Sequence, residues 1–187
     1  MQMAAPALPR GAQRHDARSA LRQRTRAAHD RVDAAFGALD LGRDEDYVRF
    51  LQAHAAAHRA LLFVWPADLP LGDDLSLIER DLAALGSAAH HAKMRVPTFR
   101  QGALGAAYVV AGSHFGKRVL RRERTMVAGE AGPLRYLSSL TTQGVWRTVL
   151  QRLNDFSDGE EGISALVSDA TATFELFGRA LSRVEGP

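Results

Sequence analysis

The sequence of 187 residues contains no cysteine. This absence excludes disulfide bonds, thiolate metal sites and cysteine nucleophiles, and it agrees with a cytoplasmic location. The sequence also lacks any apolar run near the ~20 residues that a membrane-spanning helix needs. Residues 1–10 have neither a basic start nor an uninterrupted apolar core, so we expect no secretory signal. The sequence therefore predicts a cytoplasmic protein without a membrane partner.

The chain has little net charge, with 24 basic and 21 acidic residues giving +3. It lacks the concentrated basic face that a nucleic-acid-binding surface needs, so we expect no nucleic-acid partner. A solvated helix end is the simpler interpretation of the densest basic cluster, and a docking patch for an acidic redox partner is the alternative. This cluster consists of Lys117, Arg118, Arg121, Arg122 and Arg124.

The chain shows no convincing alternation of β-branched and polar residues over the length of a strand. Residues 1–18, rich in Ala, Pro and Arg, have no periodicity and are expected to form a flexible tail. The length suits one hydrophobic core, so residues 19–187 are expected to form a single all-α domain. Ser19 could cap the first helix, and Gly144 is a possible joint in the fifth helical segment. Apolar spacing predicts helices over about 19–36, 44–65, 73–85, 98–124, 133–154 and 160–183.

The histidines are the only conspicuous candidates for metal ligands. His54 and His58 are four residues apart and could present two ligands on one helix face. The residues that follow His54 are alanines rather than the pattern of a zinc protease, so a structural pair in the core is the preferred interpretation. His29, taken alone, is better explained by packing or surface exposure. No catalytic triad, phosphate loop or dinucleotide fingerprint stands out.

Gly112 and Gly116 lie four residues apart, and so on one face, of a predicted helix. Because each costs roughly 1 kcal/mol relative to alanine, they need an explanation. One explanation is a large, flat ligand that approaches the backbone, and the other is close packing between helices. Arg22 and Arg26 flank the same side of their helix as His29, where they suit the carboxylates of such a ligand. Haem between His29 and the two glycines is thus a hypothesis.

Two segments of the chain resemble the bacterial haem oxygenases, and in particular the branch commonly found beside bacteriophytochromes. They are TRAAH, at Thr25–His29, and GAAYVVAGSHFG, at Gly105–Gly116. Shorter similarities occur at 81–86, 144–147 and 171–174, so the resemblance extends in order over about 19–183. It implies a single-domain, multi-helix haem oxygenase fold.

The resemblance also implies how the chain would act. His29 falls on the family's iron ligand for haem b, while Gly112 and Gly116 fall on the catalytic glycines and Ser113 is a possible anchor for water. The implied reaction cleaves haem to biliverdin, carbon monoxide and ferrous iron with dioxygen and electrons. A ferredoxin or reductase would supply the electrons, and a bacteriophytochrome would use the product. The further haem contacts expected are Arg22, Arg26, Tyr108, Arg179 and Arg183.

Three residues of the second segment depart from the family's pattern. Ala111 stands where an acidic residue commonly precedes the first glycine, Lys117 replaces a further glycine, and His114 is unusual beside a haem. These departures leave two alternatives to the enzyme. One is a non-catalytic haem-binding or regulatory protein, and the other is a helical interaction domain that binds no haem.

Overall fold

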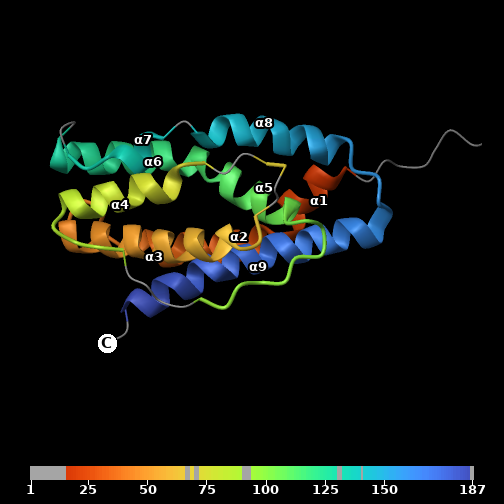
Figure 1. Cartoon of the computed structure of the whole chain (residues 1–187), viewed down its shortest axis with the longest axis horizontal. Coiled ribbons are helices and arrows are strands. Elements are labelled where there is room, and N and C mark those ends of the chain that lie inside the picture. The colour runs from red at the N-terminus through yellow and green to blue at the C-terminus, as the bar shows by residue number, and fades with distance from the viewer. Residues whose placement is uncertain are drawn as a thin grey trace, which may run out of the picture.

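A computed structural model describes residues 16–65, 68–69, 72–89, 94–129, 132–139 and 141–185, and no strand occurs among them. The prediction of an all-α protein is thus confirmed. Figure 1 shows α6, α7 and α8 along one side of the bundle and α3 and α9 along the other. The helices are α1 Ala17–Arg24, α2 Arg26–Gly37, α3 Asp44–Leu62, α4 Asp74–Ala84, α5 Leu104–Gly112, α6 His114–Ala128, α7 Arg135–Ser138, α8 Thr141–Asn154 and α9 Gly159–Glu185.

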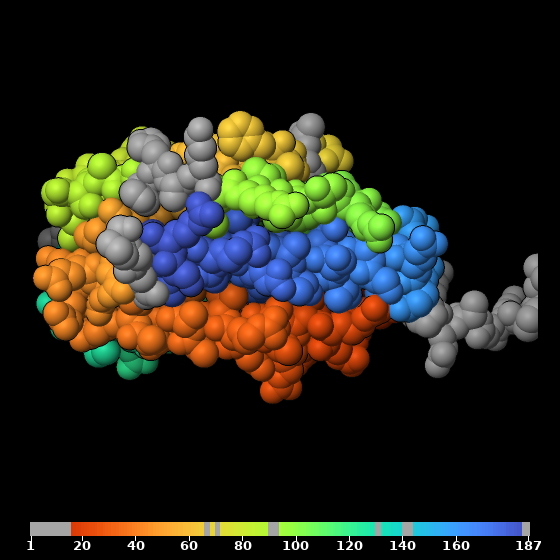
Figure 2. Space-filling model, turned by 90° about the horizontal axis from the view of Figure 1, so that it is seen from below, coloured from red at the N-terminus to blue at the C-terminus, as the bar shows by residue number. Residues whose placement is uncertain are grey.

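The last helix, α9, is the platform on which much of the molecule packs. Its apolar residues recur every three or four positions, so they form one continuous stripe that includes Leu166, Ala170 and Leu176. Helices α1, α2, α3 and α5 all contact α9. Figure 2 shows α9 as a band between α1–α2 on one side and the segment before α5 on the other. Within the described part of the chain, no helix is long and apolar enough to cross a bilayer.

The first predicted helix is divided in two at Thr25. The Thr25 hydroxyl donates a hydrogen bond of 2.7 Å to the carbonyl oxygen of Leu21, a contact that often bends helices. Helix α1 also begins before Ser19, because the Asp16 carboxylate caps it by accepting from the backbone N–H of Arg18 at 3.1 Å. Residues 1–15, most of the predicted tail, lie outside the described residues.

The helix predicted over 98–124 begins only at Leu104. Gly102 and Ala103 both have positive φ, 56° and 62°, which interrupts a right-handed helix. The backbone N–H groups of Arg100 and Gln101 instead donate to the buried carboxylate of Asp169 on α9, at distances of 2.9–3.1 Å. This contact fixes the chain that leads into α5.

Replacing Asp169 with asparagine is expected to lower the free energy of unfolding by about 2 kcal/mol. The amide keeps one acceptor but turns an N–H group toward a cluster of backbone donors. Urea denaturation of the purified variant measures the change. Asp155→Asn, at an exposed position, is the control and should stay within about 0.5 kcal/mol of the parent. Equal effects of the two substitutions would refute the anchoring role of Asp169.

The joint in the fifth helical segment lies before Gly144, which is inside α8. The chain leaves the short helix α7 at Ser139, whose backbone is extended. The start of α7 is held by the buried carboxylate of Asp81, which accepts from the N–H groups of Arg135 and Tyr136 at 3.2 and 2.9 Å. A contact with α4 therefore fixes the start of α7, and the joint follows its end at Ser138 rather than lying at the glycine.

Candidate functional site

His29 lies on α2 with half of its side chain, 52%, exposed. Its Nδ1 lies 3.1 Å from Oδ2 of Asp33, one turn further along the helix. Its ring meets the ring of Phe174 on α9 edge to face, with 5.4 Å between the centroids. When Nδ1–H donates to the carboxylate, the lone pair of the neutral ring is on Nε2, the arrangement typical of metal-ligating histidines. In that arrangement Nε2 of His29 has no hydrogen-bond role in the contact with Asp33.

The two glycines lie on either side of Ser113, where α5 ends and α6 begins. A Cβ built at Gly112 would lie 3.5 Å from the indole of Trp146 on α8. A Cβ at Gly116 would have no described atom within 4 Å, and this residue is exposed. Close helix packing therefore does not explain Gly116. The glycine that does require close packing is Gly105, where a Cβ would lie 2.4 Å from the carbonyl oxygen of Leu166 on α9.

The face of α6 that carries Gly116 turns toward the end of α2. Val127 lies three turns beyond Gly116 on the same side. A Cβ built at Gly42, in the loop after α2, would lie 3.1 Å from the Val127 side chain. Helices α2, which carries His29, and α5, which ends at Gly112, both pack on α9.

Helix α6, which contains Gly116, carries several exposed apolar side chains. The side chains of Phe115, Val119, Met126 and Val127 are each more than half exposed. Exposed apolar side chains gathered on one element indicate a binding surface. An apolar, planar ligand is compatible with this surface.

The structure brings together two of the expected ligand contacts, Arg22 and Tyr108. Burial raises the pKa of the Tyr108 phenol, and the nearby charges of Arg18 and Arg22 partly offset this effect. The Tyr108 ring also lies 5.5 Å from that of Trp146. Arg26 points to solvent, with 82% of its side chain exposed and its Nε 3.7 Å from Asp30. The positive charges of Arg18 and Arg22 therefore lie near Tyr108.

The structure places the other two expected arginines, Arg179 and Arg183, away from Arg22. Arg24 of α1 binds Glu160 in the first turn of α9, at 2.7 Å. At 1.5 Å per residue, Arg179 lies about 28 Å further along α9 than Glu160. Arg179 lies 3.6 Å from Glu175, one turn before it. Arg22 therefore lies toward the start of α9, whereas Arg179 lies about 8 Å beyond Phe174, the residue that contacts His29.

Ser113 and His114 lie at the junction of α5 and α6. The Ser113 hydroxyl donates to the carbonyl oxygen of Val110 at 2.8 Å. His114 is buried, with its Nδ1 2.6 Å from the carbonyl oxygen of Ala111. Two residues before Gly116, it lies on the opposite side of α6. Its position leaves the Gly116 face clear.

The prediction of a solvated basic helix end is wrong for Lys117 and Arg124, which are buried. The Lys117 ammonium lies 2.9 Å from Asp74 on α4. The Arg124 guanidinium donates to the carbonyl oxygens of Leu41 and Gly42 at 3.1 and 3.0 Å and also binds Asp44. These cations anchor α6 to the core, and the exposed members of the cluster are Arg118, Arg121 and Arg122.

His54 and His58 are mostly buried in the core, as their spacing predicts. The Nδ1–H of His54 donates to the Phe50 carbonyl oxygen at 2.9 Å. Burial lowers the pKa of His54 to about 3 and that of His58 to about 4, so both are neutral at physiological pH. The described residues contain no group of three or more side chains suited to a metal ion.

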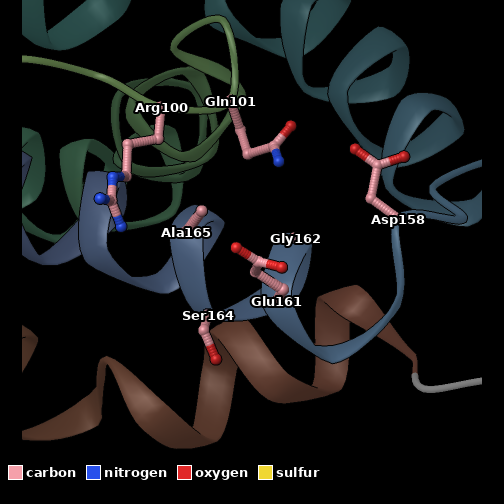
Figure 3. A pocket seen from close by; sticks show the side chains of 7 residues that line it. All are labelled: Arg100, Gln101, Asp158, Glu161, Gly162, Ser164 and Ala165. Carbon is pink, nitrogen blue, oxygen red and sulfur yellow. The ribbon is translucent and has the colours of Figure 1, made fainter.

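A hollow of about 450 Å³ at the start of α9 is a separate feature. Figure 3 shows Gln101 extending toward Asp158, with Glu161 between the two elements, while Arg100 extends to the other side and Ser164 points toward α1. Its charged lining does not suit an apolar planar ligand. It also lies about 20 Å along α9 from Phe174, the residue that contacts His29.

The sequence reasoning missed the contributions of Asp33, Phe174 and Trp146. The sequence does contain a signal for the contact between His29 and Asp33, because residues four apart lie on the same side of a helix. Phe174 and Trp146 carried no such local signal, since they reach the site from other helices.

The comparisons with known proteins bear on the fold. No protein-family model and no curated protein matches the sequence. The structure is similar to that of a haem oxygenase from Neisseria meningitidis, solved with NO and CO bound. The TM-score is 0.74 with 19% sequence identity, over 91% of this chain and 92% of the other. Structural similarity at 19% sequence identity is evidence for the fold alone. The chain has the haem oxygenase fold.

Proposed function

We propose that this protein is a haem oxygenase, which cleaves haem to biliverdin, carbon monoxide and ferrous iron using dioxygen and electrons. The observation that carries the proposal is the pairing of His29, oriented by Asp33, with the open face of Gly116. His29 lies on α2 and Gly116 on α6, and in this proposal haem binds between the two helices. The shared fold supports the proposal. A ferredoxin or reductase as electron donor, and a bacteriophytochrome as user of the product, belong to the same proposal.

The residue types proposed for the site suit the chemistry of haem. His29 offers Nε2 to iron, and Arg22 with Tyr108 offers a cation and a hydroxyl to the carboxylates at the edge of the porphyrin. Phe174 and the exposed apolar residues of α6 offer contacts to its faces. Bound haem would supply the iron at which dioxygen is activated.

The residues around the site have separate tasks in this reaction. Asp33, 3.1 Å from Nδ1 of His29, would orient the ring so that Nε2 is available as the ligand atom. Gly116 leaves space beside the ligand that a side chain would fill. The Ser113 hydroxyl donates a hydrogen bond to the carbonyl oxygen of Val110, so the hydroxyl oxygen can still accept a hydrogen bond from water.

A non-catalytic haem-binding protein is the second candidate, and Ala111 favours it. Ala111 is fully buried and apolar where the family commonly has an acidic residue. A site without that carboxylate has one group fewer for holding water and protons beside bound oxygen. This candidate predicts haem binding without ring opening.

Haem titration followed by reduction in air tests the proposal. The purified protein should take up one haem and develop a Soret band of a histidine-ligated species. With ferredoxin and its reductase, or with ascorbate, this band should decay as biliverdin absorbance rises. Haem that stays intact under prolonged reduction favours the second candidate. Absence of any Soret change on titration contradicts both.

A further inference from the structure

The strongest unassigned feature of the molecule is a buried ion pair behind the glycine-containing helices. Lys117 and Asp74 are 2.9 Å apart, and each side chain is only 5% exposed. The Lys117 ammonium also lies 3.9 Å from the centroid of the Tyr136 ring. Such a pair offsets its desolvation cost only when its remaining polar atoms are also satisfied.

Two polar atoms beside this pair find no hydrogen-bond partner among the described residues. They are Oδ1 of Asp74, an acceptor, and Nε1–H of Trp65, a donor. Leaving each of them buried and unpaired costs about 1–3 kcal/mol. Their complementary character means that one small molecule, accepting from Trp65 and donating to Asp74, would satisfy both.

Asp74 and Trp65 line the same cavity between α3, α4 and α5, together with His58. The cavity measures about 30 Å³, whereas a single water molecule needs about 10–15 Å³ by the same measure. The rest of its lining is mostly apolar and includes Leu61, Val110 and Val145. A guest therefore has polar partners at three side chains only, which is a usual number for a buried water.

We propose that Trp65, Asp74 and His58 bind an ordered water molecule inside the protein. Larger ligands exceed the cavity. A metal ion does not suit it, because Lys117 already neutralises the Asp74 carboxylate and His58 alone would remain as a ligand. Through its hydrogen bonds, the water links the Lys117–Asp74 ion pair to His58 on α3. This site does not depend on haem, so its test is independent of the proposed function.

Water-selective NMR on the whole chain tests the proposal in solution. The sequence has only two tryptophans, so Trp146→Phe identifies the indole N–H signal of Trp65. We expect a cross-peak between this N–H and water whose sign in the rotating frame is opposite to the diagonal. That sign excludes hydrogen exchange, and a laboratory-frame NOE with the same sign as the diagonal marks a water that stays longer than surface hydration water. An indole signal without such a cross-peak would overturn the proposal.

Crystal structures of two matched double variants test the same site without relying on one substitution. Asp74→Asn with Lys117→Met removes both charges but keeps an acceptor, so the water should remain. Asp74→Leu with Lys117→Leu removes the acceptor as well, so the water should be lost. Replacing a buried pair by apolar residues is often neutral for stability, and both variants should fold. Density that persists in the leucine variant, or a dry cavity in the parent protein, would overturn the proposal.

Discussion

Replacing His29 with alanine is expected to abolish the Soret band of histidine-ligated haem and, with it, the formation of biliverdin. His29 is the described histidine that combines an exposed ring with a carboxylate partner for Nδ1. Without the imidazole, the iron loses the ligand that anchors it opposite the Gly116 face. Absorbance spectra during haem titration and product analysis after reduction measure the two losses. Free imidazole added to the variant should restore the band, because it can enter the space that the side chain leaves.

Two matched variants separate ligation from general damage. His114→Ala should keep the parent spectrum, because His114 is buried on the opposite side of α6 and bonded to Ala111. Asp33→Asn should keep the ligand but loosen its orientation, lowering haem affinity or activity about 10–100-fold. If His114→Ala abolishes the band and His29→Ala does not, the iron ligand has been assigned to the wrong helix.

The sequence predicts those parts of the fold that depend on local signals. The acidic first turn of α3 and the positive φ of Gly86 after α4 correspond to boundaries that the sequence suggests. The late start of α5 combines a local cause, the positive φ of Gly102 and Ala103, with a long-range one, because Arg100 and Gln101 are held by Asp169 nearly 70 residues away. Long-range contacts of this kind are what a single sequence does not display.

The candidate site also depends partly on local signals and partly on long-range contacts. His29 and the two glycines stay predictions, which rest on their spacing and on the family resemblance. Lys117 belongs to the same segment, yet its environment depends on Asp74, 43 residues earlier. The prediction that the basic cluster is solvated is therefore wrong for Lys117, because its partner Asp74 is a buried residue on another helix.

The two glycines Gly105 and Gly116 are expected to respond oppositely to alanine. At Gly105 a Cβ would lie 2.4 Å from the Leu166 carbonyl oxygen and 2.9 Å from the Ala170 nitrogen, both backbone atoms of α9. Helix α5 must then move away from α9, so Gly105→Ala should lower the free energy of unfolding by about 3 kcal/mol. At Gly116 the added methyl group meets open space, and Gly116→Ala should raise the stability of the haem-free protein by up to about 1 kcal/mol.

Urea denaturation of both variants, followed by turnover of the haem-loaded proteins, decides what Gly116 is for. If Gly116 faces bound haem, the methyl group displaces the ligand from its productive position, and turnover should fall on the order of 100-fold. A variant that is more stable and fully active would instead mean that no ligand approaches this backbone. Gain of stability combined with loss of turnover is the outcome that only a ligand-facing glycine explains, because a glycine retained for packing would lose both together.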